Sequence, residues 1–562
     1  MPDKATSIGY ALTEVASDAV SLNDEELGLS QPPIGKSVIG RVNTPANVAR
    51  WMATTALDCL DNTRDASDPT ILEPAAGSGV IVGALFEALV SKYRGNGARP
   101  LRSPLRHIWA IDNDASVQPA SARRLANLAG REAYDWARRQ YKIGDALLDD
   151  SLLPPRPIDL IIGNPPYLGL RHASRLPEFE RWRGCFGVRE DLYALFIRRA
   201  MATIRPGGVI AFLLPDGWLS LASYEQLRRR LLQGNVRHVV RLPAGTFDRV
   251  VFPSILIWQS APPRGPMTYT DARGGGLANP DACILTDPSV FLESPRATFF
   301  VPTPEQLALS ALWRGIGASS GVIRLERAVR IADAGIHSRN CRHRLFFPTR
   351  NKPGLQRLVQ GRQIEAFALR WNAPSAQYRW VDIHYRPRPR TLGRRGNGRP
   401  SVRDEYWDWQ GDPAVHRLRE RVLIRQTGDR IIAARCLQKR AVHYTDNTLF
   451  TVTLTEQGAA QGLSLAYLTA YLNCEIVTRL YRFLSGEHGR PQAQIKVRLL
   501  RQLPFIPPTH RQRKRIESLV DRLERAVRRG ETERAAQRAM NSHFERLFTS
   551  AGQVILHHGC SR

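Results

Sequence analysis

Two consecutive prolines end an apolar run in the segment from Ile158 to Tyr167, which reads Ile-Asp-Leu-Ile-Ile-Gly-Asn-Pro-Pro-Tyr. Leu160, Ile161 and Ile162 suit a strand buried on both faces. The prolines forbid further ladder pairing, so the turn must follow the carboxyl end of that strand. In open α/β sheets ligands bind at this edge, which makes the turn a candidate site.

The residues of this turn are Asn164, Pro165, Pro166 and Tyr167. An amine conjugated to an aromatic base is a poor nucleophile until hydrogen-bond acceptors localise its lone pair. The Asn164 side-chain oxygen and the Pro165 carbonyl could each accept one N–H of such an amine, and Tyr167 could stack on the ring. The alternative is an ordinary turn followed by a core aromatic residue.

Apolar runs that suit strands alternate with helical patterns through the first half of the chain. The expected strands lie at residues 70–73, 107–112, up to 144, 158–163, 209–214, 236–242 and 254–258. This alternation predicts an α/β fold with a doubly wound, seven-stranded, Rossmann-like sheet.

Glycines and acids follow the first three of these strands. Gly77 and Gly79 would let the backbone approach a ligand closely at the start of a helix. Asp112 is placed to bind both hydroxyls of a ribose, and Asp145 could accept the amine of an adenine. Each acid alone would be an ordinary strand-end cap, but in this order they predict a nucleoside pocket.

This order of residues resembles the class I S-adenosylmethionine-dependent methyltransferases. Within them it resembles the gamma-class, TaqI-like DNA adenine-N6 methyltransferases of restriction-modification or phage-defence systems, over residues 40 to about 507. The resemblance implies a cofactor site for S-adenosylmethionine lined by Thr44, Glu73, Ala75, Gly77, Gly79, Asp112, Asp145, Ala146 and Asn164. Asp112 departs from the family pattern, which more often has glutamate at this position.

The resemblance also implies that Asn164, Pro165, Pro166 and Tyr167 surround the target amine of an extruded adenine. It places Phe247 on the opposite face of that base, and Phe252 competes for this role because the spacing in the loop is ambiguous. The implied reaction is a direct in-line displacement with no covalent enzyme intermediate. Unpairing the base costs roughly a few kcal/mol, which stacking in the pocket would offset.

The charge balance favours a polyanionic partner, because 80 basic residues against 52 acidic ones give a formal net charge of +28. Between Tyr385 and Arg403 the candidate DNA-binding residues are Arg386, Arg388, Arg390, Arg394, Arg395 and Arg399. Such a segment suits contacts to duplex DNA, with a solvated loop as the alternative. The seven cysteines show no two-residue spacing, and we expect no metal site.

The expected domains are an N-terminal extension (1–39), a methyltransferase domain (40–270), a linker with short strands (271–320), a target-recognition domain (321–508) and a charged helical segment (509–562). In the last of these, Ile516, Leu519, Val520, Leu523 and Val527 share one face. That face either packs back on the domain or forms a dimer.

No run of about 18 apolar residues occurs, so we expect no membrane association and a cytoplasmic location. The turn motif leaves two alternatives to DNA methylation. One is N-methylation of an RNA base or a protein glutamine, and the other is a catalytically silent DNA-binding subunit of a defence system. A separate restriction endonuclease or defence-system subunit is a further candidate partner.

Overall fold

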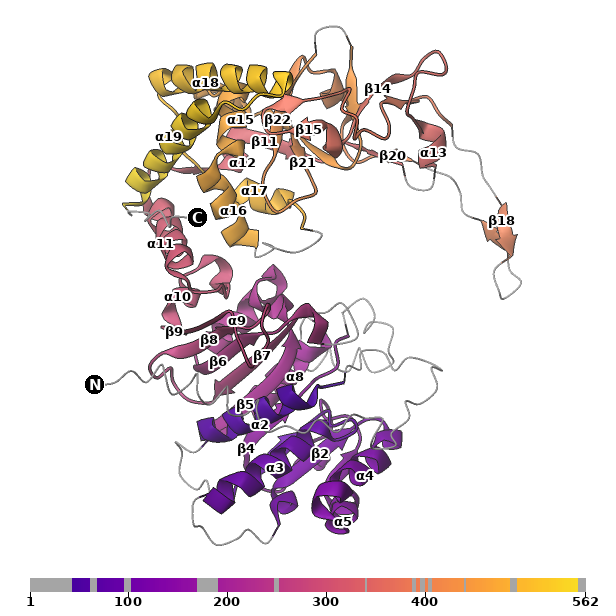
Figure 1. Cartoon of the computed structure of the whole chain (residues 1–562), viewed down its shortest axis with the longest axis vertical. Coiled ribbons are helices and arrows are strands. Elements are labelled where there is room, and N and C mark those ends of the chain that lie inside the picture. Colours follow the sequence, from indigo (N-terminus) through magenta and orange to yellow (C-terminus); the bar gives the residue numbers. More distant parts are fainter. Residues whose placement is uncertain are drawn as a thin grey trace. The chain divides into compact units, whose positions relative to one another are not determined.

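The structure is a computed structural model that describes residues 43–60, 68–95, 103–168, 191–246, 252–338, 341–386, 391–394, 400–402, 407–438, 441–485 and 493–553. The chain divides into two compact units, Met1–Thr303 and Pro304–Arg562 (Figure 1). Among the described residues, no helix combines the length and the apolar character needed to cross a membrane.

The first unit is built on a nine-stranded sheet with the order β3-β2-β1-β4-β5-β7-β6-β8-β9. The strands are β1 (Ile71–Glu73), β2 (Ile108–Asp112), β3 (Tyr141–Ile143), β4 (Ile158–Gly163), β5 (Ile204–Pro215), β6 (Asn235–Arg241), β7 (Pro253–Gln259), β8 (Met267–Asp271) and β9 (Ala282–Thr286). Only β7 and β9 run antiparallel to their neighbours in this sheet. All seven predicted strands are present, and β8 and β9 extend the sheet beyond them.

Helices cover both faces of this sheet, which confirms the predicted doubly wound class. They are α2 (Ala46–Leu60), α3 (Val80–Gly95), α4 (Gln118–Ala129), α5 (Glu132–Arg139), α8 (Leu192–Thr203), α9 (Glu225–Leu232) and α10 (Ser289–Leu292). Leu160 and Ile162 of β4 join one core cluster with residues of α2 and α3. Ile161 is equally buried but points to the opposite face, because successive side chains of a strand alternate. The apolar run of β4 is therefore buried on both sides.

The structure differs from the expected linker at residues 271–320. Gly274, Gly275 and Gly276 lie in the connection from β8 to β9, where Gly276 has a φ of 72°. A Cβ on Gly275 would lie 1.9 Å from the Asn279 carbonyl oxygen, so the close approach of the two backbones requires glycine. The glycine run that indicated a linker is the turn of a hairpin that belongs to the sheet.

The second unit combines two small sheets with helices. One sheet has the order β11-β24-β21-β22 and the other the order β13-β17-β14-β23. Their strands are β11 (Val329–Ala332), β24 (Leu449–Leu454), β21 (Glu420–Arg425), β22 (Ala433–Leu437), β13 (Phe346–Phe347), β17 (Trp380–Val381), β14 (Gln356–Val359) and β23 (His443–Thr445). Shorter pairs are β10 (Ile323–Arg324) with β25 (Pro504–Phe505), β12 (Ile336–His337) with β20 (Asp408–Trp409), β15 (Ile364–Glu365) with β16 (Ala368–Leu369), and β18 (Thr391–Arg394) with β19 (Pro400–Val402).

The helices of this unit are α11 (Pro304–Ala318), α12 (Leu325–Ala328), α13 (Arg342–Leu345), α14 (Glu456–Ala460), α15 (Leu465–Asn473), α16 (Glu475–Ser485), α17 (Val497–Gln502), α18 (His510–Arg529) and α19 (Arg534–Gly552). The charged C-terminal segment forms two of these helices, α18 and α19. Gly530 ends α18 with a φ of 79°, which allows the chain to turn. Because α18 packs against α15 and α19 packs against α11, the predicted apolar face packs back on its own unit.

Candidate functional site

The carboxyl ends of neighbouring parallel strands bring the predicted cofactor-site residues to one edge of the sheet. Glu73 ends β1, Asp112 ends β2, and Asn164 directly follows β4. Asp145 follows β3 after Gly144, whose N–H donates to the Asp112 carbonyl at 3.0 Å. Because the strand order is β3-β2-β1-β4, the side chains stand in the order Asp145, Asp112, Glu73, Asn164 along this edge.

Glu73 is a deeply buried carboxylate, with only 2% of the residue exposed. The Val82 N–H, in the first turn of α3, donates to this carboxylate. Burial, followed by repulsion from Asp112, raises the pKa of Glu73 well above its usual value. The Oε2 atom has no hydrogen-bond partner among the described residues. A buried oxygen of this kind is suited to a ligand that brings a donor or a positive charge.

The glycine-rich turn after β1 links Glu73 to Asp112. Gly77 has a φ of 50°, and its N–H donates to Asp112 Oδ2 at 2.8 Å. The Asp114 N–H donates to the other carboxylate oxygen of Asp112 at 2.9 Å. No atom of the described chain lies within 4 Å of where a Gly77 Cβ would stand, whereas a Gly79 Cβ would lie 2.2 Å from Ser121 Oγ. Gly77 therefore borders open space, and Gly79 is required by close packing against α4.

The third strand end has an ordinary capping geometry. Asp145 Oδ1 accepts from the Leu147 N–H at 2.9 Å, which is the local turn that strand-end aspartates commonly make. Ala146 is buried beside it, at 6% exposed. Ala75, in the turn after β1, is half-buried. These positions fit the predicted edge, while their contacts alone would also suit a structural role.

Asn164 is held by a residue far away in the sequence. Its Nδ2 donates to Thr44 Oγ1 at 3.1 Å, which ties the segment before α2 to the end of β4. Pro165 is buried, and Tyr167 is a half-buried ring that packs against the core cluster of the sheet. Burial raises the pKa of Tyr167 well above its usual value, so the phenol stays neutral. The two prolines restrict the backbone of the turn, and the bond to Thr44 orients the Asn164 amide.

Several predicted residues fall outside the described part of the chain. Phe247 is one of them, and among the arginines they are Arg388, Arg390, Arg395 and Arg399. Phe252 is half-buried, and its carbonyl accepts from the Asp216 N–H at 2.7 Å. Arg386 is exposed, and Arg394 ends strand β18.

Sequence reasoning missed an ionic cluster at the same edge of the sheet. Arg241, the last residue of β6, donates to Asp216 at 2.9 Å just after β5. Arg273 donates to Asp271, the last residue of β8, at 2.6 Å. The backbone bonds Asp216 N–H to Phe252 carbonyl and Leu242 N–H to Pro253 carbonyl lie beside this cluster. A charged residue directly after an apolar strand was the available signal in the sequence.

Breaking the Asp216–Arg241 pair is expected to destabilise the first unit. Only 14% of the Arg241 side chain and 9% of the Asp216 side chain are exposed. We expect Arg241→Gln to lower the free energy of unfolding by about 3 kcal/mol, because it removes the charged partner that Arg241 provides to a buried carboxylate. Urea unfolding followed by tryptophan fluorescence measures the loss. Adding Asp216→Asn should then cost little more, and Arg230→Gln, on an exposed part of α9, is the control. Equal losses in the control would contradict the assignment.

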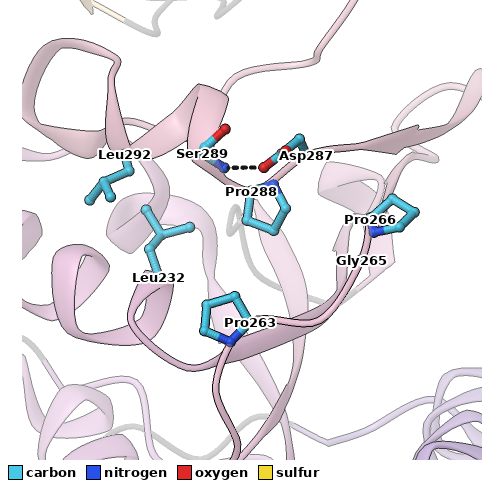
Figure 2. A pocket seen from close by; sticks show the side chains of 8 residues that line it. All are labelled: Leu232, Pro263, Gly265, Pro266, Asp287, Pro288, Ser289 and Leu292. Carbon is cyan, nitrogen blue, oxygen red and sulfur yellow. Dashed lines mark hydrogen bonds between the residues drawn. The ribbon is translucent and has the colours of Figure 1, made fainter.

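A cavity elsewhere in the first unit is not this site. Figure 2 shows its lining, which includes Leu232, Pro263, Pro266, Pro288 and Leu292. Leu232 ends α9 just before β6, and Pro266 directly precedes β8. Because β6 and β8 run parallel to β4, the cavity lies at the amino edge of the sheet, opposite the strand-end acids.

Comparison with known families matches two parts of the chain. Residues 127–246 match the Eco57I restriction-modification methylase family, and residues 356–505 match the TaqI-like C-terminal specificity domain. The first match contains the turn from Asn164 to Tyr167, and the second lies within the second unit. The two matches confirm the resemblance to gamma-class restriction-modification methyltransferases that the sequence motifs predicted.

Individual type II methyltransferases align with a little over a third of the chain. The type II methyltransferase M.TthHB8I of Thermus thermophilus is 28% identical over 214 residues, which cover 35% of this chain and 40% of the relative. M.HincII of Haemophilus influenzae is 24% identical over 221 residues, which cover 38% of this chain and 34% of the relative. The chain therefore spans less than half the length of these relatives.

A solved structure resembles this chain over most of its length. The type IIL restriction-modification enzyme MmeI, solved in complex with DNA, superposes with a TM-score of 0.59 at 12% identity. The match covers 91% of this chain and 73% of that one. At this level of identity the likeness concerns the fold, and it includes both units.

Proposed function

We propose that this protein transfers a methyl group from S-adenosylmethionine to N6 of an adenine flipped out of duplex DNA. The observation that supports the proposal most directly is the rigid turn from Asn164 to Tyr167, which follows β4 at the same edge as Asp112 and Glu73. A methyl donor held at those acids would lie beside a turn that offers two acceptors to an aromatic amine.

The described residues fit the cofactor. Glu73 presents a buried oxygen without a protein donor, and the space beside Gly77 is open. Both oxygens of Asp112 are fixed by backbone N–H groups, so its carboxylate has a set orientation for a ribose hydroxyl. S-adenosylmethionine supplies an electrophilic methyl group on a sulfonium centre. Asp145 and Ala146 would border its adenine ring, as the family pattern implies.

In the proposed reaction the Asn164 side-chain oxygen and the Pro165 carbonyl accept the two N–H groups of the target amine. This localises the nitrogen lone pair toward the methyl carbon, so that the new N–C bond forms as the C–S bond breaks and the amine proton leaves to water. Tyr167 and Phe247 would hold the extruded ring by stacking on its two faces. The enzyme contributes position and electrostatics, and no protein nucleophile takes part.

The second unit would supply target recognition. The match to the TaqI-like specificity domain spans the proposed DNA-binding residues Arg386, Arg388, Arg390, Arg394, Arg395 and Arg399. Arg394 ends β18, which pairs antiparallel with β19 and so forms a hairpin within this arginine-rich segment. Arginine suits this role because its guanidinium group binds phosphates and guanine edges through two hydrogen bonds.

The test is transfer of labelled methyl from S-adenosylmethionine to unmethylated genomic duplex DNA, followed by nucleoside analysis. We expect the label in N6-methyladenine. Label in N4-methylcytosine would contradict adenine specificity. Label only in RNA or in protein glutamine would show that the substrate is not DNA. Absence of transfer to every one of these substrates would refute the catalytic proposal and favour a silent DNA-binding subunit.

A further inference from the structure

The outer face of helix α18 carries a row of arginines that the proposed active site does not use and of which two form exposed ion pairs within the fold. Helices α18 and α19 form a hairpin on the second unit, at the end of the described chain (Figure 1). The match to the specificity domain ends at residue 505, so this hairpin lies beyond it. A role for the hairpin has to be derived from its own side chains.

The inner face of α18 accounts for the attachment of the helix to the unit. Ile516, Val520 and Leu523 are buried, and α18 packs on α15. Glu524 and Asp521 both accept from Arg435 of β22, at 2.6 and 2.8 Å. Both acids therefore pair with the domain beneath the helix, although the Asp521 side chain is 54% exposed while that of Glu524 is 7% exposed.

The outer face is almost entirely cationic. Its exposed residues include Arg511, Arg515, Arg522, Arg525 and Arg529. At 3.6 residues per turn these five positions fall within a sector of about 80°, and at 1.5 Å per residue they extend over about 27 Å. That length corresponds to about eight base pairs of duplex DNA at 3.4 Å per pair.

Most of the charge in this row remains available to a partner. Arg522 pairs with Glu533 at 3.0 Å and Arg529 with Glu531 at 2.8 Å, and both pairs are partly or fully exposed, so solvent screens them. Within the described chain, Arg511, Arg515 and Arg525 have no acidic partner. A face of uniform sign with weakly neutralised cations attracts polyanions.

Helix α19 also carries an exposed arginine, Arg546. Burial, followed by the charges of Arg515 of α18 and Arg546 of α19, lowers the pKa of the buried His543 to about 4.

The chemistry of this face favours a phosphate backbone over a protein partner. None of the exposed large apolar side chains in the described chain lies on α18 or α19, whereas protein interfaces depend on apolar or aromatic anchors. The exposed cations of α18 are arginines apart from Lys514. Arginine binds phosphate oxygens through two parallel hydrogen bonds, which an ammonium group cannot do.

We propose that the outer face of α18 binds the phosphate backbone of duplex DNA that flanks the recognition site. The inference rests on the proposed function in one respect, since it takes duplex DNA as the substrate. Contacts from exposed arginines to phosphates carry no sequence information, so the row supplies affinity that depends on salt and not on sequence. It would hold the duplex while the specificity domain selects the target.

The test compares the full-length protein with the triple variant Arg511→Gln, Arg515→Gln, Arg525→Gln. Binding to an unmethylated duplex is measured by fluorescence anisotropy from 50 to 300 mM salt. We expect binding to weaken roughly 30-fold near 0.1 M salt, and the slope of log K against log salt to fall by about 2 to 3, one counterion release for each lost contact. The kcat for methyl transfer at saturating DNA should stay within about twofold. The lost contacts would stabilise bound DNA and the transition state equally, so their removal weakens binding without slowing the chemical step.

Two further variants make the result specific. Arg123→Gln, Arg131→Gln, Arg139→Gln removes the same charge from three exposed positions of the first unit, and it should leave the salt slope unchanged. Restoring the charge with Arg511→Lys, Arg515→Lys, Arg525→Lys should recover most of the slope, which a folding defect would not do. Helix content by circular dichroism confirms that α18 is intact.

An unchanged salt slope in the glutamine variant, or an equal loss in the first-unit control, would overturn the proposal. Binding by the unmodified protein is measured first, and it separates the two hypotheses. If the unmodified protein does not bind duplex DNA, the proposed function fails together with this inference. If it binds and the glutamine variant binds equally well, only the role of α18 is wrong.

Discussion

Asn164→Ala is expected to lower kcat for methyl transfer by about 10²- to 10³-fold, the effect typical of removing one preorganised polar group from an active site. The variant loses the side-chain oxygen that would accept one N–H of the target amine. The Pro165 carbonyl remains, but one acceptor alone cannot localise the lone pair as well. Binding of duplex DNA and of S-adenosylmethionine should change little, because neither partner depends mainly on this amide.

Substitutions of Thr44 test whether the orientation of the Asn164 amide matters for the reaction. Thr44 Oγ1 accepts from Asn164 Nδ2 at 3.1 Å, so the hydroxyl orients the amide but need not touch the substrate amine. Thr44→Val removes the hydroxyl and should cost about tenfold in kcat, the effect of a modest loss of position. Thr44→Ser keeps the hydroxyl and should restore most of the rate. Such a rescue distinguishes a positioning residue from one that only fills space.

Single-turnover rates at saturating DNA and cofactor give the cleanest comparison, because they isolate the chemical step from product release. If Asn164→Ala retains most of the turnover, the amine is activated elsewhere and the assignment of the turn is wrong. If it loses cofactor binding as severely as turnover, Asn164 belongs to the methyl-donor site instead of the acceptor site.

Much of the sheet could be predicted because its strands are short apolar runs that end at polar residues. The run before Asn164 is buried on both faces, and the acids Asp112 and Asp145 stand at strand ends, as their positions in the sequence indicated. Because the strands are parallel, residues that follow successive strands in the sequence come to lie at the same edge of the sheet. Local pattern and fold agree in this region, so the edge of the sheet was predictable.

The remaining features depend on contacts between residues far apart in the sequence. The hydrogen bond between Thr44 and Asn164 joins positions separated by 120 residues, and no local sequence pattern predicts it. The Asp216–Arg241 pair likewise depends on the order in which β5, β7 and β6 lie. The glycines before β9 indicated a linker with short strands, and only the close approach of Gly275 to the Asn279 carbonyl oxygen shows why glycine is needed there.

Glu73→Gln is the second change with a large expected effect, and it should act in opposite directions on two properties. Cofactor binding should weaken by about 10- to 100-fold, since a charge-assisted hydrogen bond contributes about 1.5 to 3 kcal/mol. The ligand-free protein should become more stable at neutral and alkaline pH. Glutamine keeps the shape of the side chain and removes the charge that burial and Asp112 disfavour.

The sign of the pH dependence follows from the raised pKa of Glu73. A carboxyl group whose pKa is higher in the folded state binds its proton more tightly there than in the unfolded chain. Its contribution to the free energy of unfolding is therefore complete below the usual glutamate pKa and is lost as the pH rises through the raised value. Over that window, the stability of ligand-free Glu73→Gln should fall less steeply than that of the unchanged protein.

Thermal unfolding of the ligand-free proteins across this pH range measures the stability term, and isothermal titration calorimetry with S-adenosylmethionine measures the binding term. Glu132→Gln is the matched control, because Glu132 is exposed on α5 and makes no ion pair in the described chain. If the variant is destabilised at every pH, the main role of the Glu73 carboxylate is to accept the Val82 N–H in the first turn of α3, and not to bind a ligand. A stabilised variant with unchanged cofactor affinity would place the methyl donor away from the end of β1. The predicted combination, weaker binding with higher stability, is what a carboxylate retained for a cationic ligand should show.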